Sequence, residues 1–421
     1  MHTNFKPFWL LLAAAVCPAA AQQTLHVEVS NPSSFARDAE AVVLPLSPYG
    51  GTVRSALVSC NGQEVPCQLD DLDADGTYDE LCFLTDLKKK EHKKFTVQLL
   101  NSGEPRTYEP QVYAEMLLSN KKIKAANQQN LYISSLTADR GTNPYNQLHH
   151  HGPAFENRLV AYRIYFDHRQ TVDIYGKRHK GLELRDTQFY PDSTQKANGY
   201  GDDVLWVGST LGLGTLRGWD GQQPVMLEDV AHRTLRILAR GPLRTVVEVI
   251  DQGWNAPSTL TPQRSPLNAQ RSTLTMTTRY TLYAERRDCE VSVRFDRPAA
   301  DYRFATGIIR VKGSTEFTDG HGLRGCWGTD WPVSERDSVG HQRETVGLGI
   351  CVPAANVVSE LPADRQNYAY VVATPTDVLR YHITFCSDNE DFGYHAADTW
   401  FAYLKEWKKR LSESVVTTVS R

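Results

Sequence analysis

The sequence has no apolar run after its first twenty residues that is long enough to cross a bilayer. Charged residues interrupt every later apolar run, whereas a membrane helix needs about 20 apolar residues. Charge is nearly balanced, with 46 Lys and Arg against 49 Asp and Glu, which leaves no basic face of the size that nucleic acid requires. We therefore expect no membrane span and no nucleic-acid partner. A small molecule or a glycan fits this composition better.

Several motifs of common enzyme classes are also absent. No G-x-S-x-G occurs, which excludes the nucleophile elbow of a serine hydrolase. The glycines of the stretch NGYGDDVLWVGSTLGLGTLRGWDG do not match the spacing of a nucleotide-binding loop and fit tight turns better. No Cys-x-x-Cys pair suggests structural zinc. The sequence thus predicts no required cofactor.

The N-terminal residues resemble a secretory signal. Lys6 supplies a positive charge, Phe8 to Val16 are apolar, and Ala19-Ala20-Ala21 offers a cleavage site of small residues. We expect a signal peptide over residues 1–21 and a periplasmic or secreted mature protein. A lipoprotein modified at Cys17 is the alternative, although the residues before Cys17 suit it poorly.

Seven cysteines follow the predicted cleavage site, an odd number for an oxidising compartment. Cys60 and Cys67 flank the predicted hairpin CNGQEVPC, and a local disulfide between them is one interpretation. The others lie in strand-like or aromatic segments and are interpreted as small buried hydrophobic residues.

Short strand-like runs fill most of the remaining chain. Alternating, β-branched and aromatic runs such as FTVQLL, VAYRIYFD, TVDIYG, VLWVGSTLGLGTL and LTMTTRYTLYA predict stacked β-sheets. One helix is predicted near the end, starting at Asp398, with Phe401, Leu404, Trp407 and Leu411 on one face. The polar, Gly- and Pro-containing connector LLNSGEPRTYEP divides a β domain over 22–108 from a larger domain over 109–421.

An acidic segment in the first domain has the composition of a calcium loop. Oxygen donors alternate around Gly76, as in loops that wrap calcium, but Cys82 occupies the position where an EF-hand has its glutamate. A solvated acidic turn between two strands explains the segment equally well. The predicted calcium ligands are Asp71, Asp73, Asp75 and Asp79.

The densest group of ionisable residues lies between 149 and 185, which favours a functional site there. In VAYRIYFD, strand alternation places Arg163, Tyr165 and Asp167 on one face, and TVDIYGK adds a second strand with Asp173, Tyr175 and Lys177. These strands are predicted to form a polar floor beneath a loop of three histidines. An exposed sheet face with solvated charges is the alternative. The predicted catalytic residues are His149, His150, Glu156, Arg163, Tyr165 and Asp167.

Aromatic and polar residues in later segments suit sugar binding, because flat apolar rings stack on sugars. Core or capping roles explain each of them equally well when taken singly. The predicted substrate-binding residues are Lys177, Tyr200, Asp203, Trp219, Arg324, Trp327 and His395.

The strings VPCQLDDLDADGTYDELCFLTDL, HHHGPAFENRLVAYRIYFD, GYGDDVLWVGSTLGLGTLRGWDG and GPLRTVVEVI resemble a Bacteroidetes family of exported proteins catalogued as domain of unknown function 4861. The resemblance covers nearly the whole chain after residue 21. It implies an all-β fold similar to the galactose-mutarotase-like supersandwich and a role in breaking down polysaccharides, particularly those that contain uronates.

The resemblance favours a carbohydrate-active protein that acts on uronate-containing oligosaccharides by lyase or hydrolase chemistry on a concave β-sheet. In a lyase, Arg163 and Lys177 would hold the carboxylate while His149, His150 or Tyr165 transfers protons, and Trp219 and Trp327 would stack on sugar rings. A hydrolase would use two carboxylates drawn from Glu156, Asp167, Asp173 and Asp203. A non-catalytic glycan-binding protein and a structural assembly partner are the alternatives, and the oligomeric state stays open.

Overall fold

A computed structural model describes residues 22–50, 52–119, 131–257 and 273–421. The predicted signal peptide at 1–21 lies outside the described residues. The expectation of an all-β protein is confirmed, since the described elements are mostly strands in several sheets, and every strand pair is antiparallel. None of the helices in the described part of the chain is long and apolar enough to cross a membrane.

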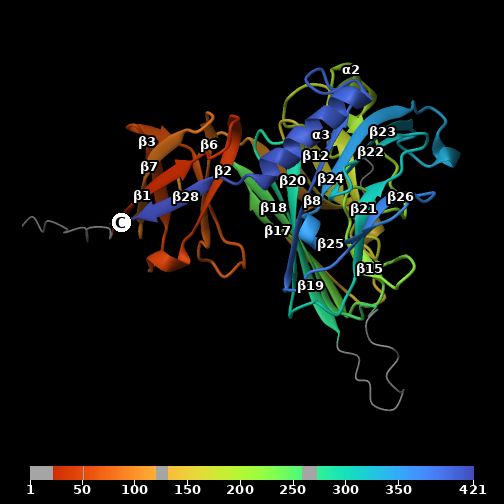
Figure 1. Cartoon of the computed structure of the whole chain (residues 1–421), viewed down its shortest axis with the longest axis horizontal. Helices are drawn as coiled ribbons and strands as arrows, with labels where there is room; N and C mark the ends of the chain where they lie inside the picture. The colour runs from red at the N-terminus through yellow and green to blue at the C-terminus, as the bar shows by residue number, and fades with distance from the viewer. Residues whose placement is uncertain (1–21, 51, 120–130, 258–272) are drawn as a thin grey trace, which may run out of the picture.

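The N-terminal domain is a small sandwich of two sheets, drawn in Figure 1 in red and orange apart from one blue strand from the C-terminus. Apolar side chains that alternate along its strands, such as Val27, Val58, Phe83 and Val97, meet between the sheets. The first sheet has the order β28(Val416–Ser420), β1(Gln22–Ser30), β7(His92–Leu100), β3(Ser55–Cys60), β4(Gln63–Val65); the second is β2(Arg37–Pro45), β6(Glu80–Leu87), β5(Cys67–Asp70).

The larger domain is built on a nine-stranded sheet. Along β19, next to the central strand β20, Leu274, Met276, Tyr280 and Leu282 are buried on the face that packs against two further sheets. The sheet has the order β10(Ser135–Asp139), β17(His232–Arg240), β18(Arg244–Trp254), β19(Leu274–Tyr283), β20(Asp288–Phe295), β27(Val378–Ser387), β24(Glu344–Cys351), β23(Leu323–Asp330), β22(Thr315–Thr318).

Two smaller sheets cover that face of the nine-stranded sheet and share its core. The six-stranded sheet is β14(Asp202–Asp203), β13(Val172–Gly176), β12(Ala161–Ile164), β11(Leu148–Asn157), β8(Val112–Leu118), β9(Leu131–Tyr132), and the five-stranded sheet is β16(Pro224–Val225), β15(Arg217–Trp219), β21(Phe304–Ile309), β26(Asn367–Val372), β25(Val357–Glu360). The remaining short elements are the 3-10 turns at Ser47–Tyr49, Tyr145–Gln147, Glu335–Asp337 and Ala354–Asn356.

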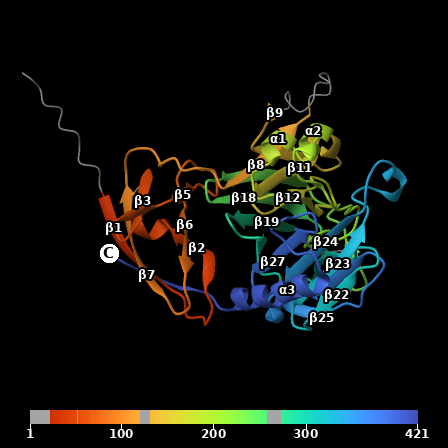
Figure 2. The ribbon, with the colours of Figure 1, turned by 90° about the horizontal axis from the view of Figure 1, so that it is seen from above.

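In the described residues, three α-helices lie outside the sheets. The short helices α1(Leu184–Thr187) and α2(Ser193–Ala197) lie beside the six-stranded sheet, as Figure 2 shows. The predicted C-terminal helix is present as α3(Ala397–Ser412), with Trp400, Leu404 and Trp407 buried against the other face of the nine-stranded sheet. Asp398 lies in its first turn, and the N-cap is Ala396. A Cβ at Gly325 would come within 2.3 Å of Leu404, so that glycine allows the close approach of the helix.

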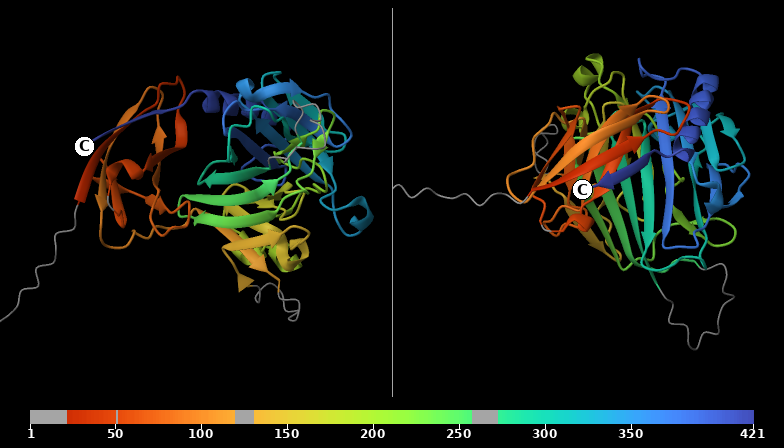
Figure 3. Two further views of the ribbon diagram at one scale, coloured as in Figure 1. Left: turned by 90° about the horizontal axis from the view of Figure 1, so that it is seen from below. Right: turned by 60° about the vertical axis from the view of Figure 1, so that its left-hand side comes forward.

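The C-terminal strand returns to the N-terminal domain. After α3 the chain runs back across the molecule and pairs β28 with β1, Val419 opposite Val27, as Figure 3 shows. A division of the chain at residue 108 therefore omits one strand of the first domain. Strand β28 is exposed and lacks the pattern of a buried strand, so no local pattern in the sequence predicts this pairing.

Two local expectations are wrong. Cys60 and Cys67 are both free, because Cys60 ends β3 in one sheet while Cys67 begins β5 in the other. The run at 204–216 is not a strand, since Gly208, Gly212 and Gly214 adopt positive φ angles that fold it into turns.

Candidate functional site

The three predicted loop histidines lie within strand β11, where its pairing is irregular. The register of β11 against β8 shifts between Leu148 and Pro153, and His151 has a φ of 68°. A Cβ at Gly152 would come within 1.7 Å of the Ile164 carbonyl oxygen, so only glycine fits beside this bulge. Backbone strain of this kind is concentrated at functional sites, where it directs one side chain. Here that side chain is His151.

The tautomer of His151 follows from its contacts. Its Nδ1 lies 3.1 Å from the Tyr145 carbonyl oxygen, which can only accept, so Nδ1 carries the proton and Nε2 keeps its lone pair. The imidazole stacks on the Tyr145 ring at 3.9 Å and meets the Tyr165 ring edge-on at 6.1 Å. The half-buried ring is thus fixed with a free lone pair.

The neighbouring histidines differ in exposure. His150 is fully buried, and its Nε2 lies 3.1 Å from Oε1 of Glu115, which is also fully buried. His149 is half-buried, and its Nε2 has no hydrogen-bond partner. Its ring lies 5.8 Å from that of Tyr190. His150 is thereby enclosed by the fold, whereas His149 and His151 reach the surface.

Arg163 lies at the centre of the charged residues, but its guanidinium is saturated by the protein itself. Strand register places Arg163 directly opposite Asp173, and its Nε and Nη2 donate to one oxygen of Asp173 at 3.0 and 2.6 Å. Nη2 also donates to Asp203 at 2.7 Å and to the Tyr165 hydroxyl at 3.3 Å, and Nη1 donates to Tyr190 at 2.7 Å. Only 4% of the Arg163 side chain is exposed. We call these five residues, together with His149 and His151, the Arg163 cluster.

Aromatic rings surround the guanidinium of Arg163. Its Cζ lies 4.2 Å from the centre of the Phe189 ring, 5.2 Å from that of Tyr165 and 5.5 Å from that of Tyr190. Contacts therefore run without a break from His151 through Tyr165 and Arg163 to Tyr190 and His149. The histidines and the charged strand face do meet, as the sequence predicted, but Arg163 fills the centre between them.

Burial changes the protonation of this cluster. Burial lowers the pKa values of His149 and His151 to about 4, with a further lowering by His150 and His151 for His149 and by Arg163 for His151, so both imidazoles are neutral at pH 7. Burial raises the pKa of Tyr190 to about 12 although Arg163 acts in the opposite direction, so that phenol keeps its proton. Burial, and then Asp173, also raise the pKa of Asp203 well above its usual range against the effect of Arg163. Neutral imidazoles and a protonated phenol therefore lie in one cluster, as acid–base catalysis requires.

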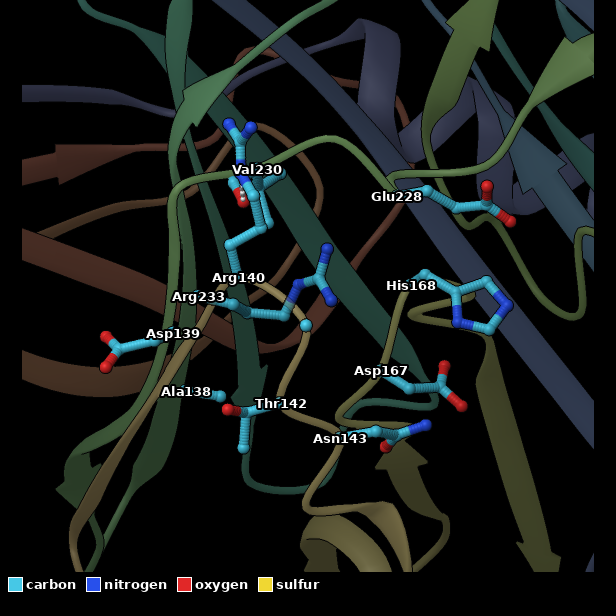
Figure 4. Close-up of a pocket in the computed structure, with 11 residues that line it drawn as sticks. Ala138, Asp139, Arg140, Thr142, Asn143, Asp167, His168, Glu228, Val230 and Arg233 are labelled. Atoms are coloured by element: carbon cyan, nitrogen blue, oxygen red, sulfur yellow. Dashed lines mark hydrogen bonds between the residues drawn. The ribbon is translucent and has the colours of Figure 1, made fainter.

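A partly exposed cation borders the cluster. The Arg169 side chain is 18% exposed, and its guanidinium lies 4.6 Å from the Tyr145 ring and 5.0 Å from the Tyr165 ring. It donates from Nε and Nη2 to Asp167 at 2.8 and 2.6 Å. Asp167 and His168 also line a cavity of about 220 Å³, together with Glu228 and Arg233 (Figure 4). A cation and a small hollow thus adjoin the cluster.

Glu156 and Lys177 lie inside the protein, where substrate does not reach. Neither is exposed, and the Lys177 Nζ donates to Glu156 at 2.5 Å and to the carbonyl oxygens of Asn157 and Gly181. Glu156 in turn accepts from the backbone N–H groups of Glu183 and Leu184 at the start of α1. This buried pair holds α1 against the sheet, and a structural role explains both residues.

The remaining predicted substrate-binding residues are spread over several elements. Tyr200 follows α2 and donates to Asp186, Trp219 lies on β15, and the exposed His395 contacts Asp388. Arg324 and Trp327 lie on β23, where Arg324 is 2% exposed and paired with Glu316, and Trp327 packs among the residues around α3. Of this group, Asp203 and the fully buried Lys177 are near the six-stranded sheet of the cluster, and Asp203 alone belongs to the cluster.

Three of the four predicted calcium ligands converge. Carboxylate oxygens of Asp71, Asp73 and Asp79 lie within 4.8 Å of one another, whereas Asp75 instead accepts from Thr77. Asp71 also accepts the backbone N–H groups of Ala74, Asp75 and Gly76, which lower its pKa. The same geometry is that of a hydrogen-bonded acidic turn, so both interpretations of the sequence stay open.

Sequence reasoning missed Tyr190 and Arg169. Tyr190 lies in the irregular segment after α1, and its 5.5 Å approach to Arg163 depends on how that segment folds. Arg169 follows Asp167 by two residues in the turn between β12 and β13, and the Asp-x-Arg spacing was a signal for a local ion pair.

A model of the family described as "Domain of unknown function (DUF4861)" matches residues 29–416. No curated protein matches. Two similar solved structures are a glycosyl hydrolase family 38 protein from Enterococcus faecalis (11% identity, TM-score 0.46) and an alpha-mannosidase from Enterococcus faecalis V583 (12%, 0.44). Each alignment covers 94% of this chain, which spans about half of those chains, 47% and 46%. At this identity the activity of those proteins does not transfer to this chain.

Proposed function

The chain belongs to the DUF4861 family, whose description assigns no activity, and we propose from its site that it is a carbohydrate-active enzyme. We infer general acid–base chemistry on a uronate-containing oligosaccharide at the Arg163 cluster, of the lyase type. The observation that carries this proposal is the strained His151, held neutral with a free Nε2 beside Tyr165, whose buried phenol keeps its proton.

Each role in the proposed reaction falls to a group with suitable exposure. Arg169 binds the uronate carboxylate, which acidifies the proton on the neighbouring carbon. His151 Nε2 removes that proton, the electron pair forms a carbon–carbon double bond, and the glycosidic bond on the next carbon breaks. Tyr190, which is 37% exposed, gives its proton to the leaving oxygen. Arg163 positions Tyr190 and stabilises the negative charge that develops on its oxygen.

Hydrolase chemistry fits the cluster less well. Asp173 and Asp203 both bind Arg163 Nη2, but Asp173 has no exposed surface and also accepts from Tyr165 at 3.0 Å. A glycosidase needs two carboxylates that flank the substrate. With Asp173 enclosed, the cluster offers one carboxylate at most, and Asp203 acts as a positioning residue for Arg163.

Export to the periplasm or medium, a Bacteroidetes origin and likeness to galactose-mutarotase-like supersandwich proteins stay predictions from the sequence. They are consistent with a role in polysaccharide breakdown outside the cytoplasm. The proposed substrate rests on Arg169 and the surrounding rings, because a cation and flat aromatic faces suit an acidic sugar.

The test is an assay of His151→Gln and Tyr190→Phe on a panel of uronate-containing oligosaccharides. Absorbance of the unsaturated product and release of reducing ends are measured together. We expect the wild-type protein to give both signals and each variant to lose about 100-fold or more in rate. His92→Gln, an exposed histidine of the N-terminal sheet, is the matched control and should keep full activity. Reducing ends without an unsaturated product would contradict lyase chemistry and indicate hydrolysis.

Saturation of Arg163 favours a second candidate, a non-catalytic glycan-binding protein. All of its hydrogen bonds described above go to groups of the protein, as in a structural ion pair. Such a protein would bind the same oligosaccharides through Arg169 and the rings but would release no product. Binding by calorimetry without either assay signal would favour this alternative.

A further inference from the structure

A second polar region lies between the two domains, on the face of the nine-stranded sheet opposite the Arg163 cluster. Two cavities of about 520 and 850 Å³ open there and share Tyr283 and Glu290 in their walls. Val43 and Glu80 of the N-terminal domain close one side, and α3 contributes Trp407 to the larger cavity. Trp407 is 4% exposed. Together the cavities form an interdomain cleft, and each has a volume typical of a ligand site.

Arginines cross the floor of this cleft in a row. Strand register places Arg236, Glu248, Arg279, Ser292 and Arg380 directly opposite one another on β17, β18, β19, β20 and β27. We call this row the arginine ladder. Because neighbouring strands lie about 4.8 Å apart, arginines on every second strand recur at intervals of about 10 Å.

At one end of the arginine ladder, on β17 to β19, the arginines are bound by other groups of the protein. Glu248 is 1% exposed, and its two oxygens bind Arg236 on one side and Arg279, at 2.5 Å, on the other. Arg279 also donates to the Leu72 carbonyl oxygen at 2.8 Å, which ties the acidic segment of the N-terminal domain to the sheet. The Arg279 side chain is nevertheless 34% exposed, so one side of it faces the cleft.

At the other end of the arginine ladder, on β20 and β27, the arginine side chains are exposed. Arg380 is 57% exposed and lies 3.9 Å from Glu290, and the adjacent Arg294 is 62% exposed and lies 3.2 Å from Asp377. Exposed pairs of this kind contribute little stability, so a ligand acid can replace them at small cost. The smaller cavity is lined by five arginines and three glutamates, an excess of two positive charges. The cleft therefore favours an anion.

We propose that the interdomain cleft binds an extended anionic oligosaccharide across the strands, with acidic groups that contact Arg279, Arg380 and Arg294. The interval of about 10 Å along the arginine ladder suits a chain that carries one acidic group on every second sugar. Carboxylate and sulfate groups share the chemistry that arginine recognises. This site lies outside the Arg163 cluster, and it does not rest on the function proposed there.

Calorimetric titration of the full chain tests the proposal. The probe is an unsulfated chondroitin hexasaccharide, which has a carboxylate on every second sugar. A second arm uses its sulfated, carboxyl-reduced derivative, and the neutral maltohexaose is the ligand control. We expect the double variant Arg294→Ala/Arg380→Ala to weaken binding by roughly tenfold or more and to reduce its dependence on salt. Arg365→Ala removes an exposed charge in the loop between β25 and β26 and is the matched control.

The outcomes separate this proposal from its alternatives. Ladder-dependent binding of the carboxylate or the sulfated probe supports the proposal and identifies the acidic group. The proposal is overturned if neither anionic probe binds, if maltohexaose binds equally, or if Arg365→Ala weakens binding as much as the double variant. The His151→Gln variant should bind the probe with unchanged affinity, so a failure of the proposed catalysis leaves this result distinct. Equal melting temperatures of all variants show that folding is intact.

Discussion

The Arg163 cluster and the arginine ladder use arginine in opposite ways. Arg163 is 4% exposed and its guanidinium binds two carboxylates and two phenols, whereas Arg380 is 57% exposed with its closest carboxylate 3.9 Å away. Arg163 orders the groups around it, whereas Arg380 faces outward. A dense group of charged residues therefore does not by itself identify the residues that touch a ligand; exposure and remaining hydrogen-bond capacity do.

The largest expected effect is on the free energy of unfolding, which should differ most between variants of the Arg163 cluster and variants of the arginine ladder. Arg163→Met leaves Asp173 and Asp203 without their cation, and we expect the free energy of unfolding to fall by about 3–5 kcal/mol. Arg380→Met removes an exposed charge and should cost less than about 1 kcal/mol. Urea unfolding measures both. Similar losses in the two variants would show that Arg163 is not the structural centre of its cluster.

A smaller effect concerns pH. His149 and His151 have pKa values of about 4 in the folded protein, against an ordinary value of 6.5. Between these values the unfolded chain binds more protons than the folded one, so their contribution to stability is complete above pH 6.5 and is lost as pH falls towards 4. After allowance for their partial exposure, we expect a combined contribution on the order of 1 kcal/mol.

The measurement compares the wild-type protein with His149→Gln/His151→Gln across this pH range. The difference in free energy of unfolding between them should change with pH, whereas His92→Gln should follow the wild-type curve. A constant difference from pH 4 to 7 would contradict the lowered pKa values. It would also weaken the assignment of His151 as a neutral base.

The smallest expected effect is at the acidic segment that Arg279 ties to the sheet. We propose that Asp71, Asp73 and Asp79 bind calcium weakly, and that added calcium raises the melting temperature by a few degrees through binding to the folded state alone. Asp73→Asn should remove this shift with little change in the metal-free protein. Thr318→Ala, in exposed β22, is a suitable control. If calcium does not change the melting temperature, the segment is an acidic turn that does not bind calcium.

Much of the fold could be predicted from the sequence because its patterns are local. Alternation identified β12, β13 and β19, and helical spacing identified α3 through Leu404 and Trp407. The pairing of Arg163 with Asp173 also follows from adjacent strands with opposed polar faces. These features depend on neighbours within a few dozen residues.

The rest of the candidate site depends on long-range packing. Glu156 and Lys177 were expected to face substrate, but both are buried beneath α1. A helix of four residues is too short to produce a periodic pattern in the sequence. His150 and His151 were expected in a loop, but they lie in β11, where successive side chains point to opposite faces of the sheet, so His150 is buried and His151 is half-buried. Burial of these side chains depends on how distant segments pack over them. Local patterns in a single sequence do not show this packing.

The pairing of β28 with β1 has a consequence for biosynthesis. Strand β28 is made long after its partner β1, so during translation the N-terminal sheet exposes an unpaired edge until residues 416–420 have been made. An open strand edge invites association with other chains. Pairing of β28 thus completes the sheet of the small domain. A truncation just after α3 would leave the larger domain folded and the edge of β1 open to association with other chains.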